Sequence, residues 1–140
     1  MQKNQIGSYQ KTLKQNLQTM TPREVEAAAF TKAAVMLEDA KSHTDNIHAY
    51  AQALRFNHLL WTIMQADVTE EANKLPPELK ANILSLSIFV DKQTTKALRS
   101  SDAKDLDILI TINRNLAAGL RETPDAATSD AGPDSTAAIG

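Results

Sequence analysis

Residues 53–64 read ALRFNHLLWTIM, a run in which large apolar side chains fall on nearly every side of a helix. A helix that is apolar around most of its circumference packs in the interior of a helical protein. We therefore expect a helix over about 45–67 that lies in the middle of the fold. Arg55, Asn57 and His58 interrupt the run, so each of these polar side chains needs a partner or a path to solvent.

The flanking sequence predicts three further helices, over 22–42, 76–100 and 102–120. Thr21-Pro22-Arg23-Glu24 has the pattern of a capping box with proline at the first helical position. Pro76-Pro77-Glu78 opens the next long helix, and Gly119 is placed to end the last one. The short joints at 42–45 and 100–102 favour antiparallel neighbours. The expected fold is therefore all-α, an antiparallel bundle of four main helices.

The two ends of the chain differ from its centre. A narrow apolar stripe in the first twenty residues consists of Ile6, Tyr9, Leu13, Leu17 and Met20. Its spacing is typical of an amphipathic helix, here a weaker N-terminal fifth helix. This helix either covers the core or acts as a movable arm that protects a groove or closes over a bound client. The expected division is an amphipathic segment at 1–20, a helical domain at 21–121 and a disordered acidic tail at 122–140.

Composition and motifs exclude most kinds of chemistry. The chain has no cysteine, which removes zinc thiolates and thiol catalysis and fits a reducing cytoplasm. Because phosphate-binding glycine motifs and His-Glu-x-x-His are missing, we expect no catalytic residue, no cofactor and no metal site, with His58 a hydrogen-bonded core or boundary residue. No run suits a membrane span, and the net charge of −2 does not indicate a nucleic-acid surface. The expectation is a cytoplasmic protein that is not an enzyme and has no small-molecule substrate.

Polar residues within the apolar helices allow two interpretations. Asn57, Asn82 and Asn113 are poor helix formers in predicted helix interiors. They either hydrogen-bond across helices and fix their register, or line a groove that binds a guest helix. Candidate partner-binding residues are therefore Arg55, Trp61, Asn82 and Arg114, which shape the groove or hold the core, together with Ile6, Tyr9, Leu13 and Leu17.

Four segments follow one another along the chain: TPREVEAAAF (21–30), ALRFNHLLWTIMQAD (53–67), LPPELKANILSLSIFVDKQT (75–94) and ILITINRNLAAGL (108–120). With Tyr9-Gln10 before them, they resemble the FlaF family of flagellar biosynthesis regulators over about residues 5–121. The resemblance implies a cytoplasmic, non-enzymatic protein that is needed for flagellin production and export. It also implies a flagellin chaperone that works alongside FlbT, the regulator of flagellin translation. The family lends no catalytic or ligand-binding residue, and the acidic tail lies outside the resemblance.

Three functions are consistent with these observations. The first is an export chaperone that offers its apolar groove to a helix of flagellin. The second is an adaptor that binds FlbT or the flagellar export apparatus, and the sequence does not separate it from the first. The third is direct binding of flagellin messenger RNA, motivated by Lys3, Lys11 and Lys14. It is disfavoured because RNA-binding proteins combine clustered bases with exposed aromatic rings.

Overall fold

The computed structural model describes residues 19–123, and within this range it contains helices and no strand. The α-helices are α2 (Pro22–Lys41), α3 (Ile47–Val68), α4 (Pro77–Ser100) and α5 (Asp107–Glu122), and the 3-10 helix η1 (Ala103–Leu106) precedes α5. The prediction of an all-helical chain with four principal helices is confirmed. The predicted N-terminal helix and the predicted tail lie almost entirely outside the described residues.

Side-chain caps determine where the helices begin. At the start of α2, Thr21 Oγ1 accepts a hydrogen bond from Glu24 N at 3.2 Å, and Glu24 Oε1 accepts one from Thr21 N at 2.8 Å. This is the predicted capping box, with Pro22 as the first helical residue. α3 begins at Ile47 because Asn46 caps it, its Oδ1 accepting from Ala49 N at 3.1 Å.

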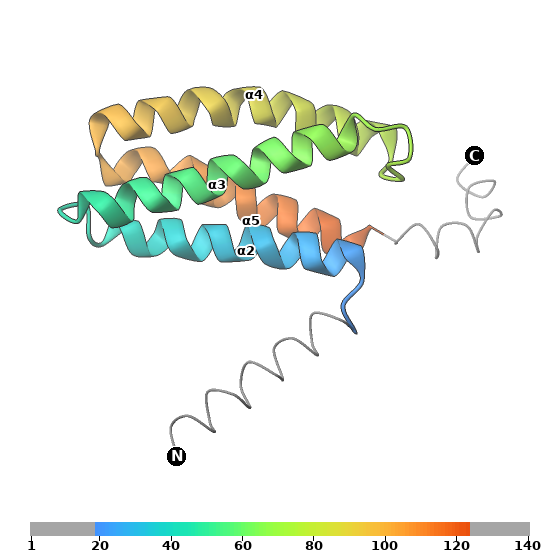
Figure 1. The fold of residues 1–140 in the computed structure, drawn as a ribbon, viewed down its shortest axis with the longest axis horizontal. Coiled ribbons are helices and arrows are strands. Elements are labelled where there is room, and N and C mark those ends of the chain that lie inside the picture. The colour runs from blue at the N-terminus through green and yellow to red at the C-terminus, as the bar shows by residue number, and fades with distance from the viewer. Residues whose placement is uncertain (1–18, 124–140) are drawn as a thin grey trace, which may run out of the picture.

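The four α-helices lie side by side, and successive helices run in opposite directions (Figure 1). α2 packs against α3 and α5, and α3 also packs against α4. The connection 42–46 holds α2 and α3 together at one end, and the two helices diverge toward their other ends (Figure 1). α4 and α5 share few close backbone approaches, although η1 contacts both of them.

The core consists of aliphatic and aromatic side chains from all four helices. The largest fully buried side chains include Phe30, Tyr50 and Trp61, and the Phe30 and Trp61 rings meet edge-to-face with centroids 5.4 Å apart. The Tyr50 hydroxyl donates to the carbonyl oxygen of Ala97 at 2.8 Å, which ties α3 to the end of α4. Buried alanines of α2 such as Ala34 allow its neighbours to approach closely.

The sequence predicts that α3 lies in the middle of the bundle, but part of its apolar surface is exposed. Leu59 and Ile63, both within the most apolar part of α3, are each 56% exposed. The reason is tertiary, because α3 packs extensively only against α2 and α4, which leaves its outer side in solvent. Among the helices between residues 19 and 123, none is long and apolar enough to span a membrane.

Candidate functional site

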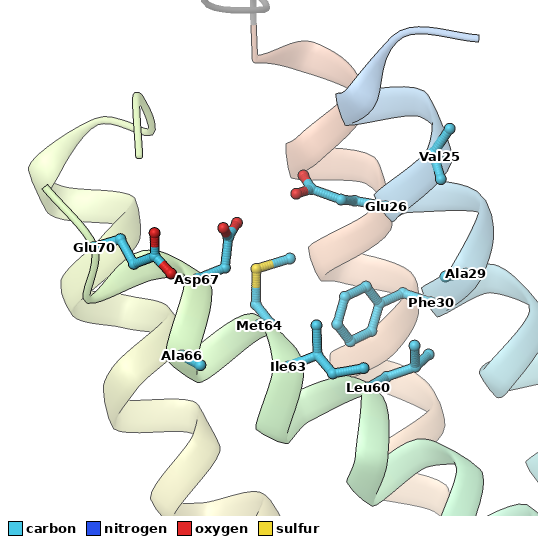
Figure 2. A pocket seen from close by; sticks show the side chains of 10 residues that line it. All are labelled: Val25, Glu26, Ala29, Phe30, Leu60, Ile63, Met64, Ala66, Asp67 and Glu70. Atoms are coloured by element: carbon cyan, nitrogen blue, oxygen red, sulfur yellow. The ribbon is translucent and has the colours of Figure 1, made fainter. Parts of the chain in front are cut away.

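An apolar groove lies between α2 and α3 at the end where these helices diverge (Figure 2). Its volume is about 550 Å³. We call it the α2–α3 groove, and its lining residues are Val25, Glu26, Ala29 and Phe30 of α2 and Leu60, Ile63, Met64, Ala66, Asp67 and Glu70 of α3 and the turn after it. It is larger than a hollow of about 280 Å³ beside the connection between α2 and α3 and than one of about 230 Å³ between α4 and α5.

The floor and the rim of the α2–α3 groove differ in exposure. Phe30 and Met64 form the floor and are almost fully buried. Val25 and Ile63 stand at the rim and are exposed, and Leu59 extends the same apolar surface along the outside of α3. A floor that belongs to the core, beneath an apolar rim that is exposed to solvent, is a shape that can bind an amphipathic helix.

One end of the α2–α3 groove is acidic. Figure 2 shows the Asp67 and Glu26 carboxylates on opposite sides of the opening, with Glu70 in the turn after α3. Glu26 Oε1 lies 2.6 Å from Arg23 Nη1, and Asp67 accepts a hydrogen bond from Asn73 Nδ2 at 3.0 Å. Within residues 19–123 no lysine or arginine forms an ion pair with Asp67 or Glu70. A basic group on a bound helix would therefore find favourable charge here.

A second and smaller apolar groove of about 230 Å³ lies between α4 and α5. We call it the α4–α5 groove, and it is lined by Leu79, Asn82, Ile83 and Leu86 of α4 and Ile112, Asn115, Leu116 and Gly119 of α5. The prediction that Gly119 ends the last helix is wrong, since α5 continues to Glu122. A Cβ built at Gly119 would meet no atom within 4 Å, so the missing side chain helps to keep this groove open.

The predicted partner-binding residues lie in different places in the structure. Trp61 is buried, and its Nε1 donates to Asn113 Oδ1 at 2.9 Å, so it belongs to the core. Arg55 and Arg114 are exposed, with Arg114 Nη2 3.9 Å from Glu38, and neither lines a groove described above. Asn82 lines the α4–α5 groove. The predicted contacts of the N-terminal segment, Ile6, Tyr9, Leu13 and Leu17, lie outside the described residues.

The asparagines divide between the two interpretations. Asn113 Nδ2 donates to Asn57 Oδ1 at 2.6 Å, and both side chains are fully buried between α3 and α5. The prediction of hydrogen bonds across helices is therefore confirmed for this pair. It is wrong for Asn82, which is exposed and makes no such hydrogen bond within residues 19–123.

His58 lies at the boundary between α3 and α4. Its Nε2 is 2.8 Å from Asp91 Oδ1, and both side chains are about half exposed. The prediction allowed a hydrogen-bonded histidine in the core or at its boundary, and the structure shows the boundary placement. In the part of the chain that the structure describes, no cluster of three or more His, Asp or Glu side chains is placed to hold a metal.

Sequence reasoning missed the residues that shape the α2–α3 groove. Ile63 and Leu59 lie off the helical stripe that Asn57, Trp61 and Met64 define, and only the excess width of the apolar surface could have revealed them. Asp67 follows the apolar run and was assigned only as part of a helix end. Asp67 lies beside the groove because α3 diverges from α2 toward this end.

Comparison with known protein families gives a match over most of the chain. The sequence model described as flagellar protein FlaF matches residues 5–120, a range that contains both grooves and nearly all of the helical residues. Searches of curated proteins and of solved structures gave no significant match. The match covers well over half of the chain. The protein therefore belongs to the FlaF family of flagellar proteins.

Proposed function

We propose that this protein is a non-enzymatic chaperone that holds a helix of flagellin in the α2–α3 groove before export, and so supports flagellin synthesis and secretion. One observation carries the proposal. An apolar groove of about 550 Å³ stays open beside Ile63, a residue whose helix otherwise forms the core of a flagellar-family protein. A chaperone of this kind would act in the cytoplasm, where flagellin waits for export.

The physics of the groove suits a helical client. An amphipathic helix inserts apolar residues spaced by three or four positions into such a groove. Each square ångström of apolar surface that leaves water contributes about 25 cal/mol before the cost of association is subtracted. Flagellin must keep its terminal helices from pairing with other copies before export, and a groove that covers their apolar stripe achieves this. No step of this function needs catalysis.

The test compares two isoleucines that differ only in position. Ile63 at the α2–α3 groove is 56% exposed and Ile88 on α4 is 57% exposed. Ile63→Glu places a charge where the client's apolar side chains would pack, whereas Ile88→Glu leaves the groove unchanged. Binding of purified flagellin is measured by titration calorimetry, and helicity of each variant by circular dichroism.

We expect the wild-type protein and Ile88→Glu to bind flagellin alike. Ile63→Glu should weaken binding at least about tenfold, which corresponds to about 1.4 kcal/mol. The proposal fails if the wild-type protein gives no binding heat. The placement in this groove fails if both variants weaken binding equally while remaining folded.

The α4–α5 groove supports a second candidate function, an adaptor that binds FlbT or the export apparatus. It is a separate apolar surface on a different pair of helices, bordered by the exposed amides of Asn82 and Asn115. Asn82→Arg with Asn115→Arg would fill it without touching the core. We expect loss of FlbT capture with unchanged flagellin binding, and unchanged FlbT capture would count against this second function.

Direct RNA binding is not proposed. Among residues 19–123 the one aromatic ring in the exposed class is Phe89. Lys92, Lys96 and Arg99 follow it along α4, but a single exposed ring gives no surface on which successive bases can stack.

A further inference from the structure

The outer side of α3 carries an apolar stripe in the described part of the chain. Leu59 and Ile63 are each 56% exposed, and Ala66 follows one turn later, also exposed. Residues three or four positions apart lie on the same face of a helix, so these side chains form one continuous stripe. Trp61, midway between Leu59 and Ile63 in the sequence, is 1% exposed and points into the core. The stripe therefore faces directly away from the core.

Unlike charges stand at the two ends of this stripe. Arg55 lies one turn before Leu59, and Glu70 lies about one turn after Ala66. Both residues are exposed, and within residues 19–123 neither side chain forms an ion pair. We call the set of Arg55, Leu59, Ile63, Ala66 and Glu70 the outer α3 face. It is positive at its first end, apolar at its centre and negative at its last end.

A face with this order of charges is complementary to an antiparallel copy of itself. A two-fold axis reverses the direction of α3, so each end of the face meets the opposite end in the other copy. When Leu59 of one copy packs between Ile63 and Ala66 of the other, Arg55 falls level with residues 67–70 of the other copy. The symmetry repeats this contact, which gives an ion pair on each side of one apolar centre. A parallel arrangement would instead bring like charges together.

We propose that two copies of this chain associate through the outer α3 face as an antiparallel, two-fold symmetric dimer. The proposal goes beyond the chaperone function and does not depend on it. Leu59, at the centre of the contact, does not line the α2–α3 groove, whereas Ile63 and Ala66 belong to both surfaces. One helix face is small beside the roughly 1,600 Å² of a standard interface, so the dimer should form at micromolar rather than nanomolar concentrations.

A charge at the apolar centre tests the dimer in the absence of flagellin. Leu59→Glu places a carboxylate at the contact, and the matched control is Ile108→Glu on α5, where the isoleucine is 41% exposed. α5 packs against α2 and shares few close backbone approaches with α3, so Ile108 lies away from the outer α3 face. Analytical ultracentrifugation of the full-length chain over a concentration series measures self-association, and circular dichroism verifies that both variants are folded.

We expect the wild-type chain and Ile108→Glu to dimerise alike. Leu59→Glu should raise the dissociation constant of the dimer at least about tenfold, because it buries a charge in an apolar contact. A wild-type chain that stays monomeric at concentrations up to about 1 mM would overturn the proposal. A dimer that Leu59→Glu leaves unchanged would also overturn it, since the copies would then meet through another surface.

Charge reversal tests the antiparallel arrangement. Arg55→Glu alone turns both ion pairs into pairs of like charge, and Glu70→Arg alone does the same with the opposite sign. Each variant should therefore associate with itself more weakly, by about fivefold or more. An equimolar mixture of the two variants forms a heterodimer in which both pairs are again opposite in charge, so mixing should restore association to near the wild-type level. Single reversals without effect, or a mixture that does not recover, would refute the antiparallel pairing.

Discussion

Replacement of Asn113 by leucine should destabilise the protein much more than the same replacement of Asn57. Both side chains are fully buried, both lie inside helices, and leucine has nearly the same size and shape. Their hydrogen bonds differ. Asn113 accepts from Trp61 Nε1 at 2.9 Å and donates to Asn57 Oδ1 at 2.6 Å, whereas Asn57 Nδ2 has no partner among residues 19–123.

The magnitudes follow from the groups that lose their partners. Asn113→Leu leaves the Trp61 indole N–H and the Asn57 carbonyl buried without partners, at about 1–3 kcal/mol each. Asn57→Leu leaves only the Asn113 amide N–H₂ unpaired and removes a buried donor that has no acceptor. The free energies of unfolding of the two variants should therefore differ by at least about 1–3 kcal/mol, with Asn113→Leu the less stable.

Urea unfolding, followed by circular dichroism and by the fluorescence of the single tryptophan, measures this difference. With a slope of about 1–3 kcal/mol per molar urea, the two midpoints should lie about 1 M apart. The double variant should be no less stable than Asn113→Leu alone, since it leaves only the Trp61 N–H without a partner. An equal loss in both single variants, or additive losses in the double variant, would refute the network as the source of the stability.

Three other predictions concern single residues. Burial, assisted by the nearby Asp105 carboxylate, raises the pKa of the Tyr50 phenol, so in a Tyr9→Phe background its absorbance titration should lie above the usual range. The unfolded chain then loses this proton first, and stability should fall as pH rises above about 10. Ser101 has a positive φ of 50°, so Ser101→Gly should raise the thermal midpoint by relieving about 0.5–1 kcal/mol of backbone strain. Thr21→Ala removes one half of the capping box and should cost about 0.5–2 kcal/mol in urea unfolding.

The helices were predictable from the sequence because their signals are local. Thr21 and Glu24 lie three residues apart and cap α2 as expected, and Pro77 begins α4. Errors arose where two local signals compete. Asn46 caps α3, although Asp45 is an equally good capping residue by type. Gly119 lies inside α5, which continues past it to Glu122.

The α2–α3 groove was not predictable in the same way. The sequence around an isoleucine in an apolar run is the same whether or not another helix covers that residue. Ile63 is exposed because of the way α2 packs against α3. Trp61 could belong to a groove or to the core until its partner was known. That partner, Asn113, lies 52 residues away in the sequence. Pairings over such distances depend on tertiary packing, which no local pattern encodes.

The core and the groove are mechanically linked through one side chain. Phe30 forms the groove floor on one side and meets the Trp61 ring edge-to-face on the other, and Trp61 is fixed in turn by Asn113. A floor held in this way is preorganised, so a bound helix does not have to order it, and that lowers the cost of association. The rim residue Ile63 is instead 56% exposed. Changes at the floor should therefore alter stability and binding together, whereas changes at the rim should alter binding alone.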